Sequence, residues 1–152
     1  MDAGERFPDY VLTDDTGAEF DSRSMAGKRY VLYFYPKDNT SGCTTEAKDF
    51  TAASADFAAL GMEVIGVSRD STASHQNFKR KQELTIRLLT DADHSLMEKV
   101  GAWGLKTNYG KTFEGVKRTT FIIGKDGNVE AVWNNVKVAG HVAKVLDKAK
   151  SL

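Results

Sequence analysis

The amino-acid sequence predicts one α/β domain that spans residues 1–152. Residues 30–35 are six consecutive apolar or aromatic residues rich in β formers, which is typical of a strand buried on both faces. A helical stripe of apolar residues follows Cys43, and a second apolar strand follows at 62–67. Strand, helix and strand within about forty residues form a βαβ unit, which implies parallel strands and a right-handed crossover.

Composition excludes several classes of protein. Lys plus Arg and Asp plus Glu number 21 each, so no bulk charge attracts nucleic acid or an anionic membrane. No apolar run approaches the roughly 20 residues of a membrane span, and the first six residues lack the apolar core of a secretory signal. Because Cys43 is the only cysteine, no internal disulfide can form, and we expect a reducing compartment, the cytoplasm.

The first third of the chain predicts an irregular lead-in, a small hairpin and the central strand. Residues 1–9 are expected to be irregular. Segments 10–12 and 18–20 pair around Asp14-Asp15-Thr16-Gly17, whose Asp and Gly suit a turn. Gly27 marks a further turn before the central strand, which Pro36 ends because proline has no N–H for the ladder.

The middle of the chain alternates helices with short strands. The helix after Cys43 is predicted to end at Gly61, a residue suited to the helix C-terminus. A weaker helix over 72–82 follows several Ser and Thr N-caps. Residues 87–89 read as a short strand, and Asp91 can cap a brief helix that runs to Val100.

The last third predicts a loop, a second hairpin and a terminal helix. Residues 101–115 hold four glycines and few periodic apolar residues, so we expect a connecting or functional loop. Segments 116–123 and 129–133 form a hairpin around a strong Asp-Gly turn. Apolar residues recur at helical spacing over 138–149, which predicts an amphipathic terminal helix.

Cys43 is the leading candidate for chemistry because it lies where the central strand gives way to a helix N-terminus. A thiol reacts as the thiolate, and a helix N-terminus and a nearby cation both lower its pKa. A lone cysteine is more often a small buried hydrophobe. Here Gly42 and Thr44 make its surroundings a polar turn, which favours a reactive thiol.

Three other residues have a functional and a structural interpretation. The hydroxyl of Thr40 can approach the sulfur or cap the helix. Glu46 can close a capping box or anchor a cation. Arg118, at the start of a strand, can point into the end of the sheet or be a solvated edge residue. The three histidines lack ligand spacing, so we expect neither a metal nor another cofactor.

The pattern P-x-x-x-T-x-x-C formed by Pro36, Thr40 and Cys43 resembles the signature of peroxiredoxins. The wider run 34–47 is similar to the bacterioferritin-comigratory (PrxQ) subgroup. The resemblance covers nearly the whole chain, through these further residues and segments: 68–70, His75, Phe78, 88–91, 109–111, 118–123, Trp133 and 136–141.

The resemblance implies a thioredoxin-like α/β fold, with a central mixed sheet flanked by helices and an N-terminal β-hairpin. It implies reduction of hydrogen peroxide and organic hydroperoxides through a sulfenic acid on Cys43. By the same resemblance, Thr40 and Arg118 activate the thiolate and orient the peroxide, Pro36 shields the site and Glu46 buttresses the arginine. We expect two residues beside the motif to contribute to substrate binding, Tyr35 and Gly42.

Two positions depart from the subgroup pattern. Lys48 stands where the subgroup often carries a resolving cysteine, which makes this chain a one-cysteine variant. We therefore expect an external thiol partner, namely thioredoxin, glutaredoxin with glutathione, or another dithiol, or else a disulfide between chains. Ser41 replaces the usual proline before the Gly-Cys pair, which should loosen the loop. The subgroup suggests a monomer or a weak homodimer.

Two other functions compete with a peroxidase. A thioredoxin-type thiol–disulfide exchanger needs C-x-x-C, whereas Cys43 is followed by Thr44, Thr45 and Glu46. A non-catalytic peroxide sensor or redox-regulated binding module would oxidise Cys43 slowly, once, and without a competent reductant. Neither nucleic acid nor a membrane is expected as a partner.

Overall fold

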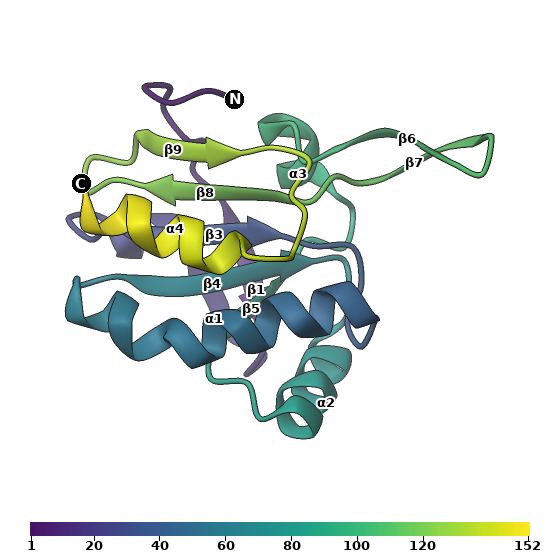
Figure 1. Cartoon of the computed structure of the whole chain (residues 1–152), viewed down its shortest axis with the longest axis horizontal. Coiled ribbons are helices and arrows are strands. Elements are labelled where there is room, and N and C mark those ends of the chain that lie inside the picture. Colours follow the sequence, from purple (N-terminus) through teal and green to yellow (C-terminus); the bar gives the residue numbers. More distant parts are fainter.

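A seven-stranded mixed sheet forms the centre of the protein (Figure 1). The computed structural model describes residues 1–107 and 109–152, together with the backbone of Asn108. The strand order is β2-β1-β5-β4-β3-β8-β9, in which β3, β4 and β5 run parallel and the other neighbours pair antiparallel. The strands are β1 (Val11–Asp14), β2 (Glu19–Asp21), β3 (Tyr30–Phe34), β4 (Glu63–Ser68), β5 (Arg87–Thr90), β8 (Thr119–Ile123) and β9 (Val129–Trp133).

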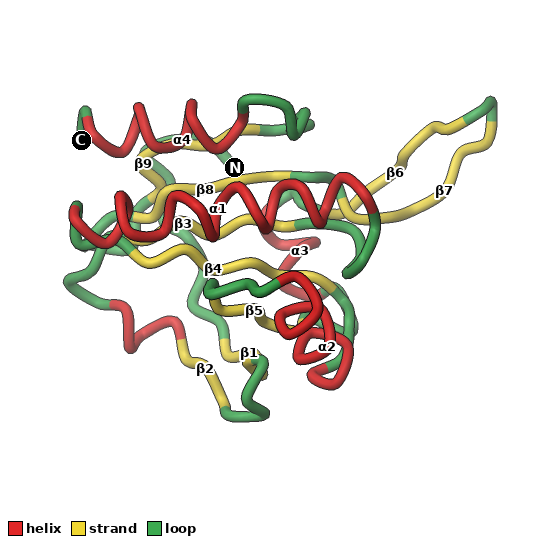
Figure 2. Tube along the Cα trace, turned by 60° about the horizontal axis from the view of Figure 1, so that its bottom comes forward, coloured by secondary structure: helices red, strands yellow, loops and turns green.

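Helices cover both faces of this sheet (Figures 1 and 2). Buried side chains of the long helix α1, of α2 and of the terminal helix α4 join one apolar cluster. The N-terminal lead-in, a short 3₁₀ helix and α3 contribute to a second cluster on the opposite face. The helices are α1 (Ser41–Ala59), α2 (Thr72–Gln82), α3 (Ser95–Val100), α4 (His141–Lys150) and the 3₁₀ helix η1 (Ser22–Met25).

Strand β3 lies at the centre, as its composition predicts. All five of its residues are buried, and alternate side chains enter the two clusters because a strand points successive residues to opposite faces. Tyr33 fits only because its neighbour Gly66 has no side chain. A Cβ added at Gly66 would lie 2.9 Å from Cζ of Tyr33.

Residues 101–115 are not the loop that we expected, and this expectation was wrong. They form most of a separate two-stranded hairpin, β6 (Trp103–Asn108) and β7 (Lys111–Val116), which projects from the body (Figures 1 and 2). Tyr109 and Gly110, with φ of 52° and 76°, make its turn. Because both faces of this β6–β7 arm are largely exposed, the sequence lacks the alternation that marks a half-buried strand.

The strand predicted over 116–123 is also corrected, because it divides in two. Strand β7 ends at Val116 and β8 begins at Thr119. At the break, the backbone N–H of Lys117 donates to the carbonyl of Ala102 at 2.7 Å. The chain changes direction here, so Arg118 lies at the end of the main sheet rather than within a ladder.

The other expected elements are confirmed to within a few residues. The N-terminal hairpin, the helix over 72–82 and the terminal helix are all present, although α4 begins only at His141. The carboxylate of Asp91 caps α3 by accepting the backbone N–H groups of Leu96 and Met97 at 3.4 and 2.9 Å. No helix in the described part of the chain is long and apolar enough to cross a lipid bilayer.

Candidate active site

Cys43 lies in the first turn of α1, beyond the carboxyl end of β3, with 1% of its surface exposed. Thr40 is the N-cap residue, and its carbonyl accepts the N–H of Thr44 at 2.9 Å. Open α/β sheets bind ligands at this end of their strands. The N-terminus of α1, with its partial positive charge, therefore lies beside the sulfur.

Arg118 joins the sulfur to a buried carboxylate. One guanidinium nitrogen, Nη2, lies 3.4 Å from Sγ of Cys43, and the other, Nη1, lies 2.7 Å from Oε1 of Glu46. Gly42 lies beside this contact, and a Cβ there would be 3.4 Å from Nη2, an ordinary van der Waals distance. The planar fork of arginine suits both contacts at once, so a fixed cation lies beside the thiol.

The electrostatics of the pair depend on burial. The side chain of Glu46 is fully buried, and this raises the pKa of Glu46 to about 7 although Arg118 opposes the shift. Burial by itself lowers the pKa of Arg118. The charges of Glu46 and Cys43 raise that pKa by more than burial lowers it, so the net shift is upward. The guanidinium therefore keeps its charge beside the sulfur.

The remaining predicted site residues lie near Cys43 and Arg118 and make different contacts. The hydroxyl of Thr40 donates to the carbonyl of Lys37 at 2.8 Å, so it bonds to the backbone rather than to the sulfur. Pro36 is partly buried beside Arg118. The hydroxyl of Tyr35 donates to Asp38 at 2.5 Å and is buried. The structure thus brings Cys43, Arg118, Glu46 and Gly42 together.

A buried polar network lies beneath the loop before α1, and the sequence did not predict it. His75 has no exposed surface, and its Nδ1 lies 2.7 Å from Oδ2 of Asp38. Ser74 donates to the same oxygen at 2.9 Å, and the N–H of Asp38 donates to Asp70 at 2.9 Å. The network ties the loop that leads to Cys43 to α2 and to the end of β4.

Two buried polar atoms near Arg118 and Cys43 have no hydrogen-bond partner among the described residues. They are the hydroxyl of Tyr33 and Oε2 of Glu46. Burial raises the pKa of Tyr33 far above its usual value, and the charges of Glu46 and Cys43 add to the shift. No group of His, Cys, Asp and Glu side chains in the described chain has the arrangement of a metal site.

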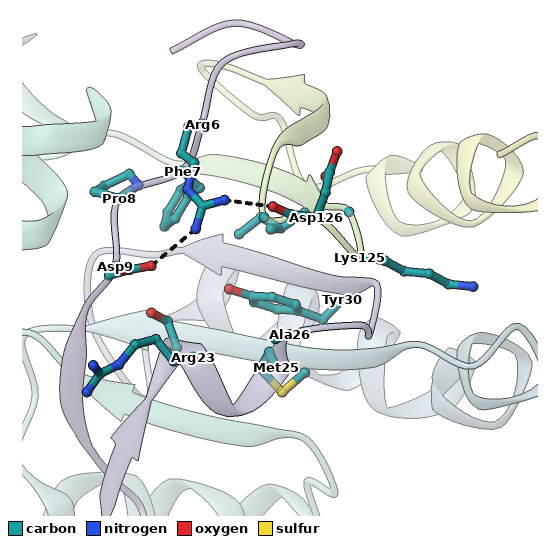
Figure 3. A pocket seen from close by; sticks show the side chains of 14 residues that line it. Arg6, Phe7, Pro8, Asp9, Arg23, Met25, Ala26, Tyr30, Lys125 and Asp126 are labelled. Atoms are coloured by element: carbon teal, nitrogen blue, oxygen red, sulfur yellow. Dashed lines mark hydrogen bonds and ion pairs between the residues drawn. The ribbon is translucent and has the colours of Figure 1, made fainter.

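A groove of about 420 Å³ opens beside Arg118. We call it the Arg118 groove, and its lining residues are Pro36, Leu105, Lys106, Thr107, Lys117, Arg118, Asn135 and Val136. A second cavity, of about 260 Å³, lies at the other end of β3, around Phe7 and Tyr30 (Figure 3). Arg6 crosses its rim, donating to the carbonyl of Asp126 at 2.8 Å. Cys43 does not line the Arg118 groove itself, but Arg118, which contacts the sulfur, does.

Three comparisons with known proteins identify relatives of this chain. Residues 3–132 match the model of the AhpC/TSA family. The chain is 44% identical to peroxiredoxin Bcp of Bacillus subtilis, covering 100% of this chain and 97% of that protein. It is 35% identical to peroxiredoxin Bcp of Escherichia coli, covering 99% and 96%.

The solved structures show the same fold. A structure of the bacterioferritin comigratory protein of Xanthomonas campestris superimposes with a TM-score of 0.92 at 40% identity, covering 99% of this chain and 98% of that one. A structure of peroxidoxin BcpB of Mycobacterium tuberculosis superimposes with a TM-score of 0.88 at 29% identity. The predicted thioredoxin-like fold is confirmed by this likeness.

Proposed function

This chain belongs to the AhpC/TSA family, as a thiol peroxidase of the Bcp (PrxQ) type, and on that premise we propose that Cys43 is the residue that attacks the peroxide. The single observation that carries the proposal is the 3.4 Å contact between Arg118 and the sulfur. It gives a thiol at a helix N-terminus the fixed cation that a thiolate requires.

The oxidative step transfers one oxygen atom to sulfur. The thiolate of Cys43 attacks the terminal oxygen of ROOH, the S–O bond forms and the O–O bond breaks. The leaving RO⁻ takes a proton and departs as ROH, or as water when the substrate is hydrogen peroxide. Sulfur loses two electrons and becomes a sulfenic acid, while the peroxide gains them.

The neighbouring residues have distinct roles in this proposal. Arg118 stabilises the thiolate and then the negative charge that develops on the leaving oxygen. Glu46 is a positioning residue, which fixes the guanidinium through its 2.7 Å ion pair. Pro36 and Gly42 shape the approach to the sulfur. Thr40 acts through its hydrogen bond to the carbonyl of Lys37, and Tyr35 acts through Asp38, so both position the loop rather than touch the thiol.

The reductive half requires thiols from another molecule, because the chain has one cysteine. A first external thiol attacks the sulfenic sulfur, releases water and forms a mixed disulfide. A second thiol then reduces that disulfide and regenerates Cys43. We propose a small dithiol or a glutaredoxin–glutathione system as the reductant. We do not expect the rate to saturate with thioredoxin concentration. We further propose a single domain over 1–152 that acts in the cytoplasm as a monomer or weak homodimer.

Steady-state peroxide reduction tests the proposal. We expect wild-type protein to turn over hydrogen peroxide and an alkyl hydroperoxide with dithiothreitol, and the Cys43→Ser variant to lose all turnover. Thioredoxin with its reductase and glutaredoxin with glutathione are compared at equal thiol concentration. Full turnover by Cys43→Ser contradicts the assignment of Cys43. Oxidation that stops after one equivalent with every reductant would instead indicate a peroxide sensor.

A further inference from the structure

His75 is a buried histidine whose two ring nitrogens both face hydrogen-bond acceptors. The residue lies on α2 with no exposed surface. Its Nε2 lies 3.0 Å from the backbone carbonyl oxygen of Leu89, and its Nδ1 lies 2.7 Å from Oδ2 of Asp38. A carbonyl has no proton to give, so Nε2 carries a proton and donates it. A neutral imidazole has only this one N–H, which leaves none for the contact at Nδ1.

The contact at Nδ1 therefore contains a second proton. Without it, the lone pair of Nδ1 would face a carboxylate oxygen at 2.7 Å, which is strongly repulsive in a buried site. Tyr35 donates to Oδ1 of Asp38 at 2.5 Å, and Ser74 donates to Oδ2 at 2.9 Å. Hydrogen bonds to a carboxylate favour its ionised form. The second proton therefore belongs to His75, and the pair is an imidazolium beside a carboxylate.

The groups around this pair favour the same charge state. The titratable groups next to it are Tyr35, at the end of β3, and Asp70, after β4. Burial raises the pKa of Tyr35 far above its usual value, so its hydroxyl remains a donor. Asp70 accepts the N–H of Asp38 at 2.9 Å and places a second carboxylate nearby. Neither aspartate pairs with a lysine or an arginine of the described chain, so His75 is the cation that balances them.

The pair holds the segment that leads from β3 to Cys43. Asp38 has only 4% of its surface exposed, although it lies in a loop. In the same loop, the carbonyl of Lys37 accepts the hydroxyl of Thr40 at 2.8 Å, and Thr40 is the N-cap residue of α1. Only residues 39–42 separate Asp38 from Cys43. A displacement of Asp38 therefore changes the position of the first turn of α1.

We infer that His75, as an imidazolium that holds Asp38, is a positioning residue for the oxidation of Cys43. The inference rests on the proposed role of Cys43. The hydrogen bonds of the His75 ring go to Asp38 and Leu89, so the histidine acts through the loop and not on the sulfur. When the ring loses its second proton, attraction between His75 and Asp38 gives way to repulsion and the loop shifts. The geometry at the thiol thus depends on one proton held outside the active site.

Nitrogen NMR tests the charge of His75. In ¹H–¹⁵N correlation spectra of the reduced, ¹⁵N-labelled protein, the two nitrogens of an imidazolium have similar shifts, whereas those of a neutral ring differ widely. The His94→Gln and His141→Gln variants assign the other two rings, so the signal of His75 follows by elimination. At about pH 7 we expect an imidazolium at His75 and a neutral ring at His141, whose pKa burial lowers to about 4. A neutral ring at His75 overturns the inference while the role of Cys43 stands.

The rate of oxidation of Cys43 tests the positioning. His75→Gln keeps a hydrogen-bonding side chain but cannot carry the charge. At about pH 7 we expect its second-order rate constant with hydrogen peroxide, per folded molecule, to be roughly tenfold to 100-fold below that of the wild type, since a small displacement of a reacting group costs this much. At the higher pH where NMR shows His75 losing its second proton, the ratio of the two rate constants should fall towards one. Thiolate formation at Cys43 is common to both proteins and cancels in this ratio.

His94→Gln is the matched control, because His94 precedes α3 and its ion-pair partner is Glu98 rather than Asp38. Its rate constant should equal that of the wild type. A ratio of wild type to His75→Gln that is near one at neutral pH, or that stays constant while His75 titrates, overturns the inference. If His75→Gln does not fold, the wild-type rate is divided by the thiolate fraction from ultraviolet absorbance, and a quotient that stays constant while His75 titrates overturns the inference. A wild type that is never oxidised at Cys43 overturns the proposed function instead.

Discussion

Oε1 of Glu46 lies 2.7 Å from Nη1 of Arg118. Glu46 lies in α1, and its side chain is fully buried. A carboxylate in such a place would be costly without a partner. The pair therefore fixes the guanidinium in one orientation, with its second nitrogen directed at Cys43.

Replacing Arg118 by lysine should slow the oxidation of Cys43. An ammonium is a point charge and cannot contact Glu46 and the sulfur together as the planar fork does. We expect the second-order rate constant with hydrogen peroxide to fall by about 100-fold, the usual cost of losing one donor to a developing oxyanion. Stopped-flow fluorescence in a single turnover measures it.

Arg29→Lys is the matched control for that change. Arg29 makes a similar forked pair with Glu130, at 2.6 and 3.1 Å, but not at the site of Cys43. Its rate constant per folded molecule should equal that of the wild type. Equal rates for Arg118→Lys and Arg29→Lys would show that the guanidinium does not assist the reaction.

Replacing Glu46 by glutamine should remove a pH dependence of stability. The pKa of Glu46 is raised from 4.5 to about 7 in the folded protein by burial. A raised carboxyl pKa means that the folded state holds the proton more tightly, so the contribution to stability is full below 4.5 and is lost as pH rises through about 7. Across this window the wild type should lose up to about 3 kcal/mol relative to Glu46→Gln.

Urea unfolding of both proteins at about pH 5 and about pH 8 measures this difference. Taking the difference between the two proteins cancels other titrating groups, including His141, whose pKa burial lowers to about 4. A difference that is the same at both pH values would mean that Glu46 keeps an ordinary pKa when folded, contrary to this prediction.

Asp38→Asn should destabilise the loop before α1. Tyr35, Ser74 and His75 all direct hydrogen-bonding groups at the carboxylate of Asp38. The NH₂ group of an asparagine would face one of the groups that now donate to Asp38, and that hydrogen bond would be lost. We expect the free energy of unfolding to fall by about 3 kcal/mol and the oxidation of Cys43 to become slower. Asp49→Asn, an exposed change on α1, is the control and should alter neither. A stable Asp38→Asn protein with slowed oxidation would assign the network to positioning alone.

Lys48→Cys should allow an intramolecular disulfide with Cys43 to form. A helix rises 1.5 Å per residue, so residues 43 and 48 are about 7.5 Å apart along the axis of α1, beyond the reach of a disulfide. The first turns of α1 must therefore unwind, and we expect the disulfide to form more slowly than the sulfenic acid. Non-reducing peptide mapping after treatment with peroxide detects it. Asp56→Cys, further along α1, should form none; a disulfide in neither variant would mean that α1 does not open.

The elements that the sequence predicts well are those with strong local patterns. The six-residue run of β3 and the apolar stripe of α1 need no distant contact to be recognised. The β6–β7 arm has no such pattern, because Leu105 and Phe113 are exposed and its strands pair only with each other. Exposed strands of this kind have little hydrophobic periodicity, so the local sequence does not predict their positions.

The site was predictable only in part for a different reason. The position of Cys43 at a strand-to-helix junction is local, but its contact with Arg118 spans 75 residues and depends on how β8 lies beside β3. The family resemblance supplied that partner, which spacing alone did not. The resemblance covers Asp38 and His75 but did not indicate their contact, because burial of a histidine on a helix depends on the packing of α2.

Trapping of the oxidised thiol tests the central claim most directly. The protein is treated with one equivalent of hydrogen peroxide without thiol, in the presence of dimedone, and its intact mass and peptides are measured. The account predicts one dimedone adduct, located on Cys43, and no disulfide within the chain. Consumption of the peroxide while Cys43 stays unmodified and reduced would contradict it.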